Sequence, residues 1–179
     1  MTTILMKETK NGVEIAYDSQ CTAFESFELE REKVFTNANG VIFGVAGLLL
    51  LNAELKHAQL PSIPQDPAMT EKWMVKTLLP HLRRLFDEVL PRRQGDMINM
   101  SILAVVHNKV YEIGCDTSIG RRVDGMYAIG SGGTLALGAM KHGASLGEAL
   151  EIAAGSDPYT GGRLTVTSAR KLLNTTVSV

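Results

Sequence analysis

Strand-like and helix-like segments follow one another along this chain in a regular order: strands, two helices, strands, two helices, strands. The first strands form a hairpin, residues 3–8 and 13–17, because Asn11-Gly12 between them tolerates the positive φ angles of a tight turn. Further strands are predicted at residues 34–36, 41–46, 98–106, 110–114, 126–129, 163–167 and 172–179. Groups of strands separated by helix pairs are typical of two sheets that pack together with helices on their outer faces.

The predicted helices span residues 48–60, 70–90, 134–141 and 145–154. Thr70 is placed to cap the second helix, in which Trp73 and several leucines recur at helical spacing and Pro80 predicts a bend. Ser145 and Glu148 have the spacing of a capping box at the start of the last helix. We interpret the apolar stripe of helix 70–90 as core rather than as a cofactor site.

The composition excludes several classes of protein. With 179 residues and 45% hydrophobic content, the chain fits a single domain, residues 1–179, with a sizeable core. Lys plus Arg total 18 and Asp plus Glu total 19, so the net charge gives no reason to expect nucleic acid or a membrane surface as a partner. No apolar run approaches the ~20 residues that span a bilayer, and no signal peptide is visible. Two cysteines without metal-ligand spacing indicate a reducing compartment, so we predict a cytoplasmic protein.

The second residue, Thr2, can carry a complete catalytic pair. Removal of Met1 would leave a threonine with both a hydroxyl and a free α-amine, whose unperturbed pKa is about 7.7–8. Such an amine can take a proton from the hydroxyl near physiological pH, and threonine activated in this way is a known nucleophile. Many chains begin with Met-Thr, so this signal needs partners elsewhere in the sequence.

Short motifs along the chain resemble those of proteasome β-type subunits, above all those of bacterial HslV. They are Thr2-Thr3-Ile4, Tyr17-Asp18-Ser19-Gln20-Cys21-Thr22, Glu32-Lys33-Val34, Gly44-Val45-Ala46-Gly47, Ile129-Gly130-Ser131-Gly132-Gly133 and Asp157-Pro158-Tyr159-Thr160-Gly161-Gly162. Each motif is weak alone, but together they cover nearly the whole chain in the family's order. The resemblance implies an α+β fold, the four-layer αββα sandwich of N-terminal nucleophile hydrolases, and threonine endopeptidase activity.

The resemblance assigns the nucleophile to Thr2, and it pairs Lys33 with Asp18 beside it. The lysine of the family stabilises the deprotonated oxygen and lowers the pKa of the neighbouring amine, and the aspartate fixes the lysine. Without the resemblance, Lys33 is equally well interpreted as a solvated lysine in the charged run 28–33, and Asp18 as a turn residue.

The resemblance also assigns the supporting residues. Gly47 matches the glycine whose N–H forms the oxyanion hole, and Ser131 matches a serine near the nucleophile's amine. Asp157 and Thr160 match acidic and hydroxyl residues of a later loop. The alternative interpretations are a glycine at a strand–helix junction for Gly47 and a helix cap for Ser131.

By position, the substrate pocket is predicted to be lined by Cys21, Arg31, Phe35, Val45 and Leu49. This mixture does not specify a side-chain preference. The family needs no cofactor for its chemistry, and it sometimes binds a structural cation, monovalent or divalent, through backbone carbonyls of the later loop. The candidates here are Ala154, Asp157 and Thr160.

The sequence departs from HslV at several positions. Tyr17 and Ser19 replace glycines beside the aspartate, and Leu48 follows Gly47 where a small residue is common. The family implies homo-oligomeric stacked rings that degrade unfolded proteins supplied by a partner ATPase, because this chain has no ATPase motif of its own.

Two other functions remain open from the sequence. A chain that keeps Met1 has an amide in place of the free amine, and would be an inactive ring or shell subunit with a structural role. The glycine-rich turn at 130–133 could also cradle a phosphate, although it lacks the spacing and lysine of a P-loop.

Overall fold

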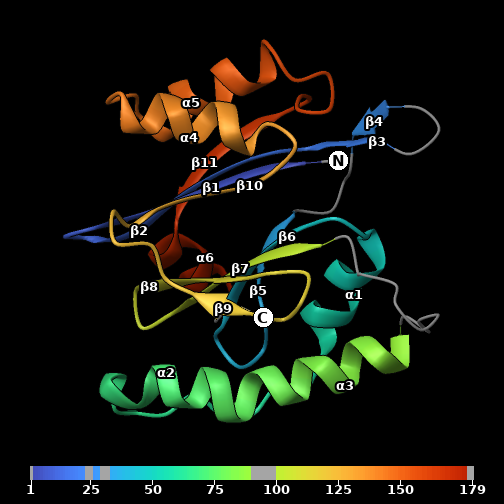
Figure 1. Ribbon diagram of the computed structural model, residues 1–179, viewed down its shortest axis with the longest axis vertical. Coiled ribbons are helices and arrows are strands. Elements are labelled where there is room, and N and C mark those ends of the chain that lie inside the picture. The colour runs from blue at the N-terminus through green and yellow to red at the C-terminus, as the bar shows by residue number, and fades with distance from the viewer. Residues whose placement is uncertain (1, 23–25, 29–32, 90–99, 177–179) are drawn as a thin grey trace.

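In the computed structural model the chain builds four layers, helices, sheet, sheet and helices, which follow one another from top to bottom in Figure 1. The structure describes residues 2–22, 26–28, 33–89 and 100–176. This arrangement confirms the predicted αββα sandwich. None of the helices in these ranges is long and apolar enough to span a membrane.

The upper sheet has four antiparallel strands in the order β10-β1-β2-β11. Its strands are β1 (Thr3–Thr9), β2 (Gly12–Asp18), β10 (Met126–Gly130) and β11 (Leu164–Ser168). Its outer face is covered by α4 (Gly133–Lys141) and α5 (Leu146–Ala154). The predicted capping box opens α5, because Ser145 and Glu148 exchange hydrogen bonds with each other's backbone.

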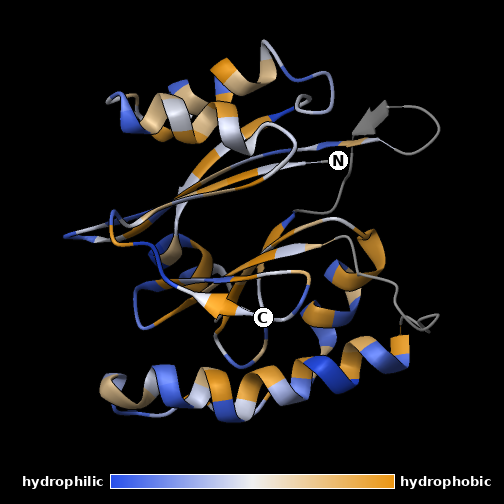
Figure 2. Cartoon of the chain, viewed as in Figure 1, coloured by the Kyte–Doolittle hydropathy of each residue, from blue (hydrophilic) through white to orange (hydrophobic). Residues whose placement is uncertain are grey.

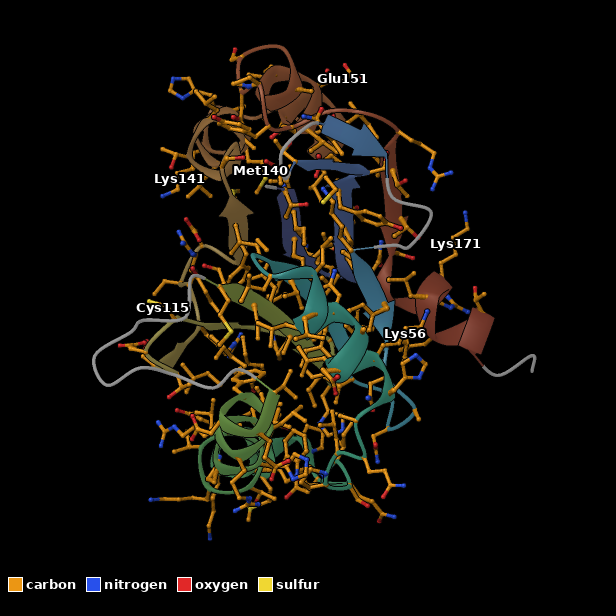
Figure 3. The ribbon with its side chains drawn as sticks, turned by 90° about the vertical axis from the view of Figure 1, so that its right-hand side faces the viewer. Lys56, Cys115, Met140, Lys141, Glu151 and Lys171 are labelled. Carbon is orange, nitrogen blue, oxygen red and sulfur yellow. The ribbon has the colours of Figure 1, made fainter. Side chains whose placement is uncertain are left out.

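The lower sheet has five strands in sequence order, and a separate two-stranded sheet projects beside the upper one (Figure 1). The lower strands are β5 (Val34–Thr36), β6 (Ile42–Ala46), β7 (Ser101–Val106), β8 (Lys109–Ile113) and β9 (Ile119–Gly120). The small sheet consists of β3 (Gln20–Thr22) and β4 (Ser26–Glu28). The helices below are α1 (Leu49–His57), α2 (Thr70–Trp73) and α3 (Leu79–Val89). Figure 3 shows α1, with Lys56 near its end, in front of this sheet.

Alternating side chains along β1 explain why the layers stack. Ile4 and Met6 point into the core between the sheets, whereas Leu5 packs against α4 and α5, and all three are fully buried. In β6, Ile42 faces the core between the sheets and Phe43 faces the helices below. A strand that is buried on both faces needs apolar residues at successive positions, because these point alternately to the two faces. Burial of each such side chain stabilises the fold by roughly 1.5–3 kcal/mol.

The predicted strand at 172–179 is wrong, because the structure has a helix there, α6 (Ala169–Thr176); residues 177–179 lie outside the described ranges. Ser168 starts this helix, since its side-chain oxygen accepts a hydrogen bond from Lys171 N at 3.3 Å. Ala169 and Leu172, one helical turn apart, pack against the core between the sheets. Burial of this face therefore outweighs the strand preference of the β-branched residues that follow.

The helix predicted at 70–90 is present but irregular. Thr70 is not its cap, because its hydroxyl hydrogen-bonds with His107 Nδ1 at 2.9 Å; Asp66 instead caps a 3-10 turn, Pro67–Met69. A π-helical turn, Met74–Leu78, separates α2 from α3. Pro80 follows it and has no N–H to donate to the earlier turn, so the distortion predicted for this proline lies next to the π turn.

Candidate active site

The ends of four strands of the upper sheet meet at one edge. At this edge β1 begins and β10 ends, with Thr3 opposite Gly130, while β2 ends at Asp18, opposite Leu164 at the start of β11. Thr2 therefore lies directly before β1, beside the end of β2. Antiparallel pairing brings together residues that are far apart in the sequence.

Asp18 is the centre of the hydrogen bonds at this edge. Its Oδ1 accepts hydrogen bonds from Thr2 Oγ1 at 3.2 Å, from Thr3 N at 2.8 Å and from Lys33 Nζ at 2.8 Å. Its Oδ2 accepts a hydrogen bond from Gly161 N at 3.1 Å. The carboxylate is completely buried, and these donors hold it in a single orientation.

Lys33 reaches this carboxylate from the lower sheet, at the start of β5. Its side chain is only 3% exposed, and its ammonium also donates to the carbonyl of Gln20, so the solvated interpretation of this lysine is wrong. Burial lowers the pKa of the Lys33 ammonium below its usual value, and the charge and hydrogen bond of Asp18 limit that fall. The arrangement places a buried cation and the hydroxyl of Thr2 on the same carboxylate oxygen.

Ser131, Asp157 and Thr160 form a second group beside Thr2. The Ser131 and Thr160 hydroxyls each donate to Asp157 Oδ2 at 2.6 Å, and Ser131 N donates to the carbonyl of Thr2 at 3.0 Å. Burial alone would raise the pKa of the Asp157 carboxyl, but these hydroxyl hydrogen bonds outweigh it and hold the pKa below its usual value. Gly132, not Ser131, occupies the cap position of α4, so the capping interpretation of Ser131 is wrong.

Gly47 follows β6 and faces the same space as Thr2. A cavity of about 460 Å³ is lined by Thr2, Thr22, Ala46, Gly47, Leu48, Met100, Ser101, Gly130 and Ser131. Gly47 has a φ angle of 132°, in the left-handed region that favours glycine. The structure thus brings together all seven residues that the resemblance assigns to catalysis.

The glycine-rich turn at 130–133 is used by the protein itself. Gly132 N donates to Thr3 Oγ1 at 3.0 Å, and Ser131 N donates to the carbonyl oxygen of Thr2 at 3.0 Å. Two amides of the turn therefore already have internal partners, which argues against the phosphate-binding interpretation.

Gly130→Ala is expected to destabilise the protein by about 3 kcal/mol. Gly130 has a φ angle of 93°, and a Cβ atom there would lie 1.7 Å from the carbonyl oxygen of Thr2. Gly138→Ala is the matched control, because a Cβ at that position in α4 meets nothing within 4 Å. Urea unfolding should show the loss for Gly130→Ala and none for Gly138→Ala. Equal midpoints for both variants would contradict the steric argument.

The residues predicted to line the pocket are distributed differently. Phe35 and Val45 pack in the core below the lower sheet, Cys21 is buried in β3, and Leu49 is 44% exposed at the start of α1. None of these is among the described residues that line the cavity beside Thr2. Arg31 lies outside the described residues. Their role in substrate binding stays a prediction.

The cation predicted in the later loop also stays a prediction. The loop is tightly closed, since Asp157 N donates to the Ala153 carbonyl at 2.7 Å and Thr160 N donates to the Asp157 carbonyl at 3.1 Å. Within the described ranges, no group of three or more His, Cys, Asp or Glu residues could hold a metal ion.

Thr3 and Gln20 belong to the site, although the sequence did not single them out. Thr3 joins the two groups of hydrogen bonds, because its N–H donates to Asp18 and its hydroxyl lies 2.6 Å from Thr160 Oγ1. Gln20 binds the later loop, with N donating to Gly161 O at 3.0 Å and Nε2 to Pro158 O at 2.9 Å. Neither role has a local signal in the sequence, since each partner lies far along the chain.

Several solved structures are similar to this one over nearly its whole length. Thiobacillus denitrificans BPH matches with a TM-score of 0.73 and 18% identity, over 94% of this chain and 98% of that one. Its complex with epoxomicin matches with a TM-score of 0.74 and 18% identity, over 94% and 99% of the two chains. Eukaryotic HslV from Trypanosoma brucei matches with a TM-score of 0.59 and 22% identity, over 93% and 98%. This chain has their fold.

The resemblance to HslV is thus confirmed at the level of the fold, the αββα sandwich. No family model and no curated protein matches the sequence. At such low identity the likeness shows the fold alone, so the activity has to be argued from the residues of this site.

Proposed function

We propose that this chain is the threonine-type endopeptidase subunit of a self-compartmentalised protease that cleaves unfolded proteins. The observation that carries the proposal is the position of Thr2. Its hydroxyl shares the Asp18 carboxylate with the buried ammonium of Lys33, and it lines a cavity together with Gly47.

In the first step, Thr2 Oγ attacks the carbonyl carbon of the scissile peptide bond. The free α-amine of Thr2, exposed once Met1 is removed, takes the hydroxyl proton. The Lys33 ammonium favours the deprotonated oxygen by its charge. Asp18 keeps the ammonium in place and compensates its burial.

The negative charge that develops on the substrate oxygen is stabilised by the N–H of Gly47. A donor of this kind contributes roughly 3–4 kcal/mol to the transition state. The amine then returns its proton to the leaving amine of the substrate, the C–N bond breaks, and an ester on Thr2 remains. Water, activated by the same amine, hydrolyses this ester and regenerates the hydroxyl.

We further propose that the protein acts in the cytoplasm as stacked homo-oligomeric rings, to which an ATP-dependent unfoldase supplies substrates. Similarity to the fold of HslV supports this proposal. Ala169 and Leu172 pack against the core between the two sheets of their own chain. Exposed apolar residues such as Leu135, Ile152 and Val166 are available for contacts between chains.

The proposal is tested by comparing two forms of the purified protein. One form is released from a cleavable fusion so that it starts at Thr2, and the other keeps Met1. We expect only the first form to hydrolyse unfolded casein and to react with epoxomicin, the compound bound by Thiobacillus denitrificans BPH. Light scattering should give the same particle size for both forms. Equal activity of the form that keeps Met1 would contradict the mechanism, and inactivity of both would favour a structural subunit.

A further inference from the structure

The lining of the cavity beside Thr2 includes apolar side chains that the proposed chemistry does not use. Apart from the residues already discussed, its described lining consists of Thr22, Ala46, Leu48, Met100 and Ser101. No described side chain in this lining is charged. The lining combines the hydroxyl groups of Thr22 and Ser101 with the large apolar side chains of Leu48 and Met100.

Leu48 is an unusual residue for its position. It occupies the N-cap of α1, where it makes no side-chain hydrogen bond, and it is 46% exposed. Ser, Thr, Asp or Asn at an N-cap would stabilise a helix by roughly 1 kcal/mol, and an exposed leucine provides nothing comparable. A position that departs from this local preference at the rim of a catalytic cavity points to a role in binding.

Met100 supplies a firm apolar surface at the same cavity. It is 3% exposed and belongs to the core cluster below the lower sheet, so the surrounding core holds it in place. The start of α1 next to this cavity is strongly hydrophobic, as the orange segment in Figure 2 shows.

We propose that Leu48 and Met100 form a subsite that selects substrates with a large apolar side chain next to the scissile bond. The proposal rests on the proposed peptidase function and adds the substrate class. Burying a leucine or phenylalanine side chain of the substrate against Leu48 and Met100 releases water from both surfaces. A charged side chain would lose hydration there without a partner among the described lining residues.

The test uses peptides that differ only in the residue on either side of the cleaved bond: leucine, phenylalanine, asparagine, glutamate or lysine. The form that starts at Thr2 should cleave the leucine peptide with a kcat/KM roughly 10–100-fold above that of the asparagine peptide. In Leu48→Asn this ratio should fall to below about a third of its original value. Leu50→Asn is the matched control, because Leu50 is 47% exposed on the same turn and is not among the described lining residues. Its ratio should equal that of the unmodified chain.

Three results would overturn the subsite: no preference in the unmodified chain, a preference for glutamate, or the same ratio in Leu48→Asn. A preference for glutamate would instead favour Arg31, from the predicted pocket. If no peptide is cleaved, the peptidase proposal fails. The subsite is then tested on its own by measuring the binding of the same peptides to Thr2→Ala with fluorescence polarisation. Tighter binding of apolar peptides upholds it, and equal binding of apolar and polar peptides overturns it.

Discussion

Thr2→Ala, in a chain that starts at residue 2, is expected to lower peptide hydrolysis by at least about 10³-fold. Alanine keeps the α-amine but removes the oxygen that forms the ester, so no covalent intermediate can arise. The lost hydrogen bond to Asp18 is only one of several on that carboxylate, so the fold should be retained. The measurement is kcat/KM on a fluorogenic peptide, with unfolding curves for both proteins.

Thr2→Ser is the matched variant, because serine keeps the hydroxyl and the amine and loses only a methyl group. It should retain hydrolysis well above that of Thr2→Ala. If Thr2→Ala stays within about tenfold of the unmodified chain, another group must carry out the attack.

Asp18→Asn should destabilise the protein by about 3–5 kcal/mol, the usual effect of removing one partner of a buried ion pair. The Lys33 ammonium would remain buried without a counter-charge, since its side chain is 3% exposed and that of Asp18 is 0% exposed. The asparagine side chain would also place an N–H donor where both carboxylate oxygens of Asp18 accept hydrogen bonds. Urea unfolding at neutral pH measures the loss.

Glu112→Gln is the matched control for this variant. It removes the acidic partner of Arg122, but both side chains of that pair are about one-third exposed, 34% and 31%. Exposed pairs contribute only ~0–1 kcal/mol, so the change in stability should be small. Equal losses in Asp18→Asn and Glu112→Gln would contradict the burial argument.

Combining Asp18→Asn with Lys33→Met separates stability from catalysis. The buried charge is then absent, so the stability should recover in large part. Hydrolysis should not recover, because the ammonium that favours the deprotonated Thr2 oxygen is missing. Recovery of hydrolysis together with stability would show that the pair has a structural role alone.

Local signals in the sequence predicted the elements that depend on local geometry. The first hairpin follows from Asn11-Gly12, and the start of α5 follows from Ser145 and Glu148. The helix at the end of the chain was missed because the β-branched residues Thr175 and Thr176 at its end favour strands, whereas the packing of Ala169 between the sheets favours the helix.

In the site, too, residues that belong to recognisable motifs were predicted, and residues whose role depends on distant contacts were not. The resemblance identified Thr2, Asp18 and Lys33, whose proximity the structure describes. It could not identify Thr3, which looks like an ordinary strand residue and acquires its partner Thr160 only when the later loop folds back. The lining of the cavity was also unpredictable, because it depends on which face of each strand is turned toward Thr2.

The most direct test of the central claim is peptide mapping by mass spectrometry after reaction with a threonine-reactive inhibitor. The protein should be purified from its own cells, so that its natural N-terminus is preserved. We predict that the chain starts at Thr2 and carries one inhibitor molecule on that residue. Retention of Met1, or hydrolysis that persists with the inhibitor attached elsewhere, would contradict the account.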